Sequence, residues 1–246
     1  MESNQPSLIK FLPSYVGSKA YWVRGLDRYR GRHFVEFFGG SGVISANLAS
    51  RAILNDTDPF LWRYFMEYES QPVMETFTEA DYFDRRGRPD WWRWLYYLQK
   101  MSFSGVYRHS RNGYNVPIKQ SYRGGSVSLA DDLHRSVARF RELAPELYML
   151  DYADVPVPEE RDVAVLDPPY ESKKAAYNVK FDYGRYWEFV GECVRAFRTV
   201  IVFDWDQNME AHLPGRPYLK RNMRVNGKHK GATEAMCVID NEGGWP

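Results

Sequence analysis

Short apolar runs alternate with longer amphipathic segments along most of the chain. The apolar runs predict strands at 33–38, 52–56, 146–152, 163–167 and 199–205, and a final pair near 217–225 and 233–241. Apolar residues recur at three- and four-residue intervals in 43–50, 58–69 and 184–198, which predicts helices with one buried face. This alternation is typical of an α/β protein whose mostly parallel sheet binds ligands at the carboxyl ends of its strands.

The alternation breaks between about residues 71 and 143. This stretch carries three tryptophans at 91, 92 and 94, a loop rich in glycine and arginine, and a helix-like end. It predicts a small, mainly helical domain at 71–143, inserted between two parts of the α/β domain at 1–70 and 144–246. The tryptophans are expected to form its core rather than to stack on a ligand.

The composition fits one α/β domain with a small insertion, because 246 residues with 44% apolar and 16% aromatic side chains can bury a sizeable core. The net charge is only +1, but the basic residues are clustered. Six lysines or arginines and no acid occur from Trp91 to Ala130, and again from Ala211 to Thr233. The clusters indicate one positive face, which favours binding to phosphates, although charge runs are also common on solvated surfaces.

Cysteine and histidine usage gives no sign of a metal site. Cys193 and Cys237 lie in apolar segments and are expected to be buried, reduced thiols. The histidines are scattered without metal-ligand spacing, so no metal is expected. The N-terminus lacks a signal-peptide pattern and no apolar run approaches the ~20 residues of a membrane span, which predicts a cytoplasmic protein.

A glycine-rich turn follows the first predicted strand. Gly39-Gly40-Ser41-Gly42 stands between that strand and an apolar helix. Glycines let a ligand approach the backbone closely, and free N–H groups at a helix start favour a carboxylate or phosphate. Asp56 ends the next strand and is placed to bind ribose hydroxyls, or else to cap the helix that begins near Pro59. Together the two features predict a nucleoside cofactor.

The tetrapeptide Asp167-Pro168-Pro169-Tyr170 follows the apolar run at 163–166. The Asp167 carboxylate and the Pro168 carbonyl can accept the two hydrogens of a planar exocyclic amine, and Tyr170 can stack on the ring that carries it. The prolines restrict the loop and keep it extended. The alternative is a strand-ending turn, in which aspartate and proline are common.

These motifs resemble, in the same order, those of the Dam-type DNA adenine-N6 methyltransferases: Tyr15–Lys19, Phe34–Gly42, Leu54–Asp56, Phe103–Arg108 with Tyr114–Pro117, and Asp167–Tyr170. The resemblance extends from about Phe11 to Asn241. It departs from the family at Phe37, where proline is usual, at Ser104, where asparagine is usual, and in the compactness of the middle region. The last two departures touch substrate handling and leave the recognised sequence open.

The resemblance implies a Rossmann-like methyltransferase sheet, mostly parallel with an antiparallel C-terminal hairpin, and methyl transfer from S-adenosylmethionine to an adenine flipped out of DNA. It implies a catalytic role for Asp167, Pro168, Pro169 and Tyr170. The cofactor would be bound by Tyr15, Gly17, Lys19, Glu36, Phe38, Gly39, Gly40, Ser41, Gly42, Asp56, Asp151 and Tyr152. Lys19 would flank the methionine part and Asp151 would accept from the adenine amine, but Lys19 is also explained by a surface charge and Asp151 by a turn.

The inserted segment is expected to recognise double-stranded DNA through Tyr107, Arg108, Arg111, Asn112 and Lys119, with phosphate contacts as plausible as base contacts for the arginines. A monomer is favoured, and a role in restriction-modification is one option. Two alternatives stay open: methylation of another planar amine (cytosine N4, an RNA adenine or a protein glutamine), and an inactive nucleic-acid-binding relative. Cytosine enzymes usually begin the tetrapeptide with serine and glutamine enzymes with asparagine, so Asp167 favours adenine.

Overall fold

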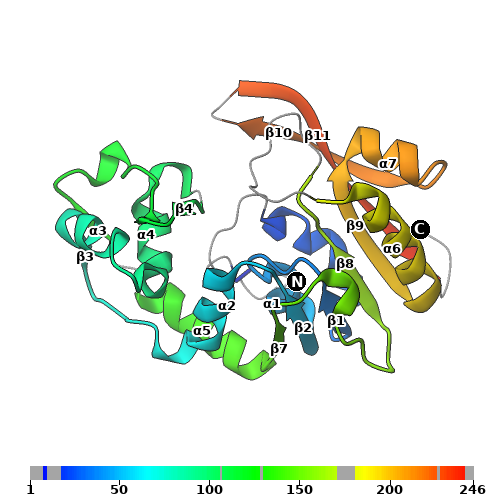
Figure 1. Ribbon diagram of the computed structural model, residues 1–246, viewed down its shortest axis with the longest axis horizontal. Coiled ribbons are helices and arrows are strands. Elements are labelled where there is room, and N and C mark those ends of the chain that lie inside the picture. Colours follow the sequence, from blue (N-terminus) through cyan, green and yellow to red (C-terminus); the bar gives the residue numbers. More distant parts are fainter. Residues whose placement is uncertain are drawn as a thin grey trace, which may run out of the picture.

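The computed structural model describes residues 8–9, 18–105, 107–127, 130–170, 181–225 and 228–241 (Figure 1). Its main sheet has seven strands in the order β10-β11-β9-β8-β1-β2-β7. Their bounds are β1 His33–Glu36, β2 Arg51–Asn55, β7 Glu146–Tyr148, β8 Val163–Leu166, β9 Thr199–Trp205, β10 Tyr218–Val225 and β11 Lys228–Asp240.

The strand directions confirm the predicted fold class. β1 pairs in parallel with β2 and β8, β2 with β7, and β8 with β9, whereas β11 is antiparallel to both β9 and β10. The result is an α/β fold with a mostly parallel, Rossmann-like sheet and an antiparallel C-terminal hairpin. The chain adds β2 and β7 on one side of β1 and β8 and β9 on the other. Open α/β sheets bind ligands at such a switch point.

The observed strands match the predicted ones except at some ends. The strand predicted at 146–152 stops at Tyr148, because the Leu150 N–H donates to the Asn55 side chain (2.9 Å) instead of to a neighbouring strand. The strand predicted at 233–241 begins earlier, at Lys228, because its first residues continue the ladder with β10.

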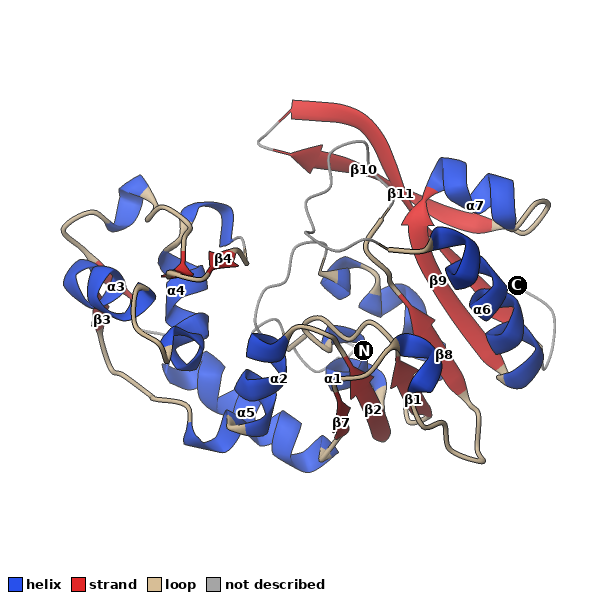
Figure 2. Ribbon diagram, in the orientation of Figure 1, coloured by secondary structure: helices blue, strands red, loops and turns tan. Residues whose placement is uncertain are grey.

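Helices cover both faces of the sheet (Figure 2). They are α1 Val43–Leu48, α2 Pro59–Met66, α6 Tyr183–Ala196 and α7 Asp206–His212, with short 3-10 turns η1 Lys19–Tyr21, η2 Val23–Tyr29, η3 Tyr68–Ser70 and η7 Tyr152–Asp154. Phe34 packs with residues of η2 and α1, and the next residue, Val35, packs with residues of α6. Because successive side chains of a strand point to opposite faces, the two apolar clusters lie on opposite sides of the sheet.

Residues 71–143 lie beside the sheet and are mainly helical (Figure 1). They comprise α3 Glu79–Arg86, α4 Leu95–Met101, α5 Ala130–Leu143, the turns η4 Trp91–Trp94, η5 Phe103–Gly105 and η6 Gln120–Tyr122, and the short strands β3 Phe77–Thr78, β4 His109–Ser110, β5 Gly113–Tyr114 and β6 Ser126–Val127. Trp91 and Trp92 are buried, as predicted for core residues, and Trp94 is partly buried and packs against the core.

Both cysteines are buried free thiols, as predicted. Burial raises the pKa of Cys193 to about 12 and that of Cys237 to about 11, so both stay protonated at neutral pH. Within the described ranges, no helix is long and apolar enough to cross a membrane.

Candidate active site

Three motifs meet at the carboxyl edge of three neighbouring strands. Asp167 follows β8, the glycine turn follows β1 and Asp56 follows β2, and these strands are adjacent in the order β8-β1-β2. Segments more than a hundred residues apart in sequence are therefore brought to one edge of the sheet, at its switch point.

Asp167 faces the surface with a lysine behind it. Its side chain is 24% exposed, whereas that of Lys19 is only 5% exposed, and the Lys19 Nζ lies 2.8 Å from Asp167 Oδ2. Burial raises the pKa of Asp167, and the charge of Lys19 opposes that rise. The ammonium therefore favours an ionised carboxylate that can accept hydrogen bonds from the exposed side.

Tyr170 is half-buried and is oriented by its hydroxyl and its ring. The hydroxyl donates to Glu234 Oε1 at 3.2 Å, and the ring meets the Trp205 ring edge-on at a centroid distance of 5.0 Å. Burial and the charges of Asp167 and Glu234 raise the pKa of Tyr170 well above its usual range, so its hydroxyl remains a donor. A hydrogen bond also holds the residue before Tyr170 in place, because the Pro169 carbonyl accepts from the Tyr183 hydroxyl at 2.9 Å.

Glu234 belongs to this site although the sequence motifs do not include it. It is 2% exposed on β11 and lies 3.2 Å from the Lys19 Nζ through Oε1. Its Oε2 accepts from the Trp22 indole N–H at 2.9 Å. The one sequence signal was a single acid at the start of the apolar run 235–239.

The glycine turn packs tightly against β2. The Gly39 N–H donates to the Asn55 carbonyl at 2.6 Å, and Gly40 and Gly42 have φ of 50° and 60°. A Cβ at Gly42 would lie 3.0 Å from a methyl of Leu54. Glycine is therefore required here by the turn itself. Two other residues of this segment were also predicted to bind the cofactor. Ser41 is buried, and the Phe38 ring lies 5.2 Å from the ring of Tyr152.

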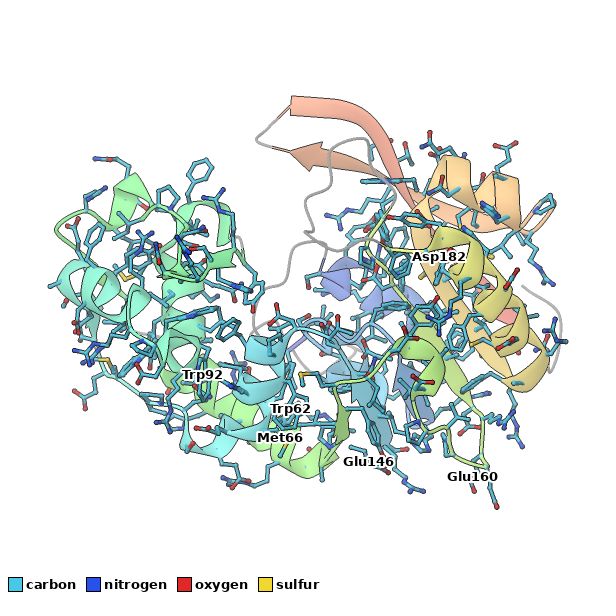
Figure 3. All side chains as sticks on the ribbon, in the orientation of Figure 1. Trp62, Met66, Trp92, Glu146, Glu160 and Asp182 are labelled. Atoms are coloured by element: carbon cyan, nitrogen blue, oxygen red, sulfur yellow. The ribbon has the colours of Figure 1, made fainter. Side chains whose placement is uncertain are left out.

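Asp56 is oriented by two backbone N–H groups, from Gly40 at 2.8 Å and from Asp58 at 2.9 Å. The cap of α2 is Asp58, which accepts from Phe60 and Leu61, so the interpretation of Asp56 as the helix cap is wrong. Burial raises the pKa of Asp56 to about 6. Asp56 lines a hollow together with Trp62 of α2, which is labelled in Figure 3. The remaining lining residues are Gly39, Gly40, Leu54, Asn55, Phe65, Leu147 and Tyr148.

Two further predicted acids differ sharply in environment. Glu36 is buried under the turn, where Oε1 accepts from the Ser45 N–H at 2.7 Å, and burial raises its pKa to about 7. Asp151 is exposed and pairs with both guanidinium nitrogens of Arg185 at 2.9 Å, which lowers its pKa. Asp151 also accepts from the Ala153 N–H and caps η7, as expected if it is an acid in a turn. Its neighbour Tyr152 is buried.

Two predicted cofactor residues, Tyr15 and Gly17, lie outside the described residues. In the part of the chain that the structure describes, no group of three or more histidine, cysteine, aspartate or glutamate side chains could bind a metal ion. The described site is thus a set of carboxylates, one buried lysine, aromatic rings and backbone N–H groups.

The residues expected to contact DNA differ in their exposure and in their contacts. Tyr107 is 9% exposed, and its hydroxyl donates to Asp58 Oδ1 at 3.0 Å, so it points toward α2. Arg108 is exposed and donates to the side chain and the carbonyl of Asn115. The Lys119 ammonium donates to the Lys100 carbonyl at 3.3 Å.

Arg111 and Asn112 form the exposed tip of the β4–β5 hairpin, since Ser110 pairs with Gly113. Gly113 has a φ of 98°, and a Cβ there would lie 2.2 Å from the carbonyl oxygen of Arg86. Glycine thus lets the hairpin dock on the end of α3 while its tip stays exposed.

His109, which the sequence motifs do not include, joins this hairpin to α2. Its Nε2 lies 3.3 Å from Asp58 Oδ2, and its ring lies 4.8 Å from that of Phe60. Because Asp58 also donates its N–H to Asp56, a chain of contacts connects the hairpin to the hollow.

Neither a scan of protein-family models nor a search of curated proteins finds a match to this chain. Among solved structures, wild-type Trm5b from Pyrococcus abyssi is similar with a TM-score of 0.42 and 11% identity, over 90% of this chain and 48% of that one. The chain thus spans about half the length of Trm5b. A proposed methyltransferase from Pseudomonas syringae has a TM-score of 0.38 and 9% identity, over 89% and 97% of the two chains.

Proposed function

We propose that the protein transfers a methyl group from S-adenosylmethionine to N6 of an adenine flipped out of double-stranded DNA. One observation carries the proposal: the Asp167 carboxylate is backed by the Lys19 ammonium at 2.8 Å, remains open on one side, and has the Tyr170 ring next to it in the loop. A carboxylate and an aromatic ring in this relation suit a planar amine, because one accepts its hydrogens and the other stacks on its ring.

The residues that line the hollow beside Asp56 suit the nucleoside part of the cofactor chemically. A carboxylate next to apolar and aromatic side chains offers acceptors for ribose hydroxyls and a surface for a flat base. Asp56 would bind the ribose, the backbone from Phe38 to Gly42 would hold the methionine end together with Tyr15 and Gly17, and Asp151 and Tyr152 would bind the base. When bound, the cofactor supplies an electrophilic methyl group.

The chemistry left to the protein is alignment. Asp167 would accept a hydrogen of the base amine, which lets the nitrogen pyramidalise and stabilises the charge that develops on it. Tyr170 would stack on the base, which is worth roughly 1–3 kcal/mol, whereas flipping costs a few kcal/mol. Stacking alone therefore does not cover both flipping and specificity, and contacts from residues 71–143, proposed as a target-recognition domain, must supply the rest.

Methylation of genomic DNA that lacks modified bases, followed by modification-sensitive sequencing, tests the proposal. The expected result is N6-methyladenine in one sequence context. Methylation found only on RNA, on cytosine or on protein would show that this acceptor, and not DNA adenine, is the substrate. Lack of thermal stabilisation by saturating S-adenosylmethionine would favour an inactive nucleic-acid-binding protein.

Asp56→Ala should weaken cofactor binding by about ten- to hundredfold, the usual size for hydrogen bonds to a charged group. Because the pKa of Asp56 is about 6, binding by the parent should weaken as the pH falls below that value, and the variant should lose this dependence. Calorimetric titration with S-adenosylmethionine measures both effects. The control is Asp84→Ala, which removes an exposed acid from α3. Equal affinity in Asp56→Ala and the parent would exclude the ribose role.

Arg111→Ala should weaken DNA binding, because Arg111 stands at an exposed hairpin tip within an acid-free basic stretch. A phosphate contact predicts a uniform loss and a salt slope smaller by about 1, whereas a base contact predicts relaxed target preference by roughly 1–3 kcal/mol. Fluorescence anisotropy at several salt concentrations separates the two. The control is Arg88→Ala just after α3, which removes an arginine paired with Asp84. Unchanged affinity and preference in Arg111→Ala would remove it from the DNA surface.

A further inference from the structure

Glu234 is a buried carboxylate on which three donors converge, two from η1 and its C-terminal cap and one from the loop after β8. It is 2% exposed, and its Oε1 lies 3.2 Å from both the Lys19 Nζ and the Tyr170 hydroxyl. Its Oε2 accepts from the Trp22 indole N–H at 2.9 Å. A carboxylate buried in this way is tolerated because its charge is paired and hydrogen-bonded.

Two of these donors belong to the proposed catalytic site: Tyr170 is part of its loop, and Lys19 contacts the loop. Lys19 lies between the carboxylates of Glu234 and Asp167, at 3.2 Å and 2.8 Å from their nearest oxygens. Its Nζ is also 5.1 Å from the centre of the Tyr170 ring. Glu234 therefore contacts, from the buried side, both the cation that backs Asp167 and the ring proposed to stack on the base.

We infer that Glu234 is a positioning residue of this site, which holds the Lys19 ammonium against Asp167 and fixes the orientation of the Tyr170 ring. The inference rests on the proposed function, because both orientations matter only if a planar base docks there. Glu234 does not touch the base; it acts through Lys19 and Tyr170. The buried face of β11 thus becomes part of the alignment machinery.

Glutamine at position 234 cannot reproduce this arrangement. A carboxylate offers two acceptor oxygens and no donor, whereas an amide offers one acceptor oxygen and an NH2 group. With three donors converging on the side chain, the NH2 of glutamine must face at least one of them. Either Lys19, Tyr170 or Trp22 then loses its partner, and the loop that carries Asp167 loses part of its support.

The charge of Glu234 also acts on Asp167. The negative charge of Glu234 raises the pKa of Asp167, and sharing Lys19 between two carboxylates leaves less of its charge to Asp167. The charged and titratable groups that interact with Asp167, or with the tyrosines beside it, are Lys19, Glu36, Asp56, Tyr170, Tyr186, Asp204 and Glu234. Neutralising Glu234 should therefore lower the pKa of Asp167 and move the acid limb of the activity profile to lower pH.

Kinetics of Glu234→Gln on unmodified genomic DNA test the inference. The expected result is a kcat lower by about ten- to hundredfold, an acid limb shifted to lower pH, and S-adenosylmethionine affinity within about twofold of the parent. The control is Asp240→Asn, which neutralises an acid on the same strand that pairs with Arg28 instead. It should keep the parent rate and pH profile.

Tyr170→Phe provides a second measurement that does not depend on the folding of Glu234→Gln. It removes the hydroxyl that donates to Glu234 and that also hydrogen-bonds with Asp167, and kcat should fall while cofactor affinity is kept. Combined with Glu234→Gln, the losses should be less than additive, because both variants break the same contact. A parent-like kcat in Tyr170→Phe, or a Glu234→Gln acid limb that does not move, overturns the inference while the proposed function stands. Absence of methyl transfer by the parent protein overturns both.

Discussion

Asp167→Ala is expected to reduce methyl transfer to DNA by about a hundredfold or more while cofactor affinity stays within about twofold of the parent. Loss of a hydrogen-bonding group aimed at developing charge usually costs 10²–10³ in kcat. Here the substitution also removes one of the two carboxylates that pair with the buried Lys19 ammonium. The hollow beside Asp56 does not include Asp167, so cofactor binding should survive. Single-turnover transfer from labelled S-adenosylmethionine gives the rate, and calorimetry gives the affinity.

Asp162→Asn is the matched control. Asp162 precedes β8 directly and Asp167 follows it, so the two aspartates stand at opposite ends of the same strand. Asp162 accepts from the His33 N–H at 3.3 Å and pairs with Arg198, away from the carboxyl edge. A parent-like rate in Asp167→Ala, or an equal loss in the control, would contradict the assigned role.

The parts of the site that the sequence could predict are short and contiguous. The tetrapeptide at 167–170, the turn at 39–42 and Asp56 each follow an apolar run, and parallel strands bring such ends to one edge of a sheet. The fold class followed from the same alternation, and the strand predicted at 199–205 has those bounds in the structure. Only strand ends shifted, where a side chain such as Asn55 replaces a strand as hydrogen-bond partner.

The parts that the sequence could not predict depend on contacts between distant residues. Trp22 and Glu234 are 212 positions apart, and no local pattern connects them. The placement of Lys19 against Asp167 also depends on how η1 packs on the finished sheet. The inward orientation of Tyr107 could not be predicted for the same reason, because Asp58 at the start of α2 sets it. The motifs thus predicted which residues lie at one edge of the sheet. The direction of their side chains depends on tertiary packing and could not be predicted from the motifs.

Glu36→Gln is expected to change how stability depends on pH. The pKa of Glu36 is raised by burial to about 7 in the folded protein, above its ordinary value of 4.5. A carboxyl with a raised folded pKa contributes stability that is fully present below the unfolded pKa and is lost as the pH rises through the folded one. The parent should therefore lose stability between pH 5 and 8 through Glu36, and the glutamine variant should not.

The size of the effect follows from that pKa. From pH 5 to pH 8, Glu36 should cost the parent about 2–3 kcal/mol of unfolding free energy, and Glu36→Gln should not show this loss. Urea denaturation of both proteins at the two pH values measures the difference. The glutamine oxygen can still accept from the Ser45 N–H, so the hydrogen bond of Glu36 is kept. Glu160→Gln changes an exposed glutamate before β8 and should leave the pH dependence unaltered (Figure 3).

A pH dependence that is the same in Glu36→Gln and the parent would show that Glu36 is not the titrating group. If the difference is observed, the protein retains at this edge an acid that lowers its stability near neutral pH. Asp56 and Asp167 have raised pKa values for the same reason, burial at the carboxyl ends of neighbouring strands. Acids that cost stability and cluster at one edge are typical of sites maintained for function rather than for folding.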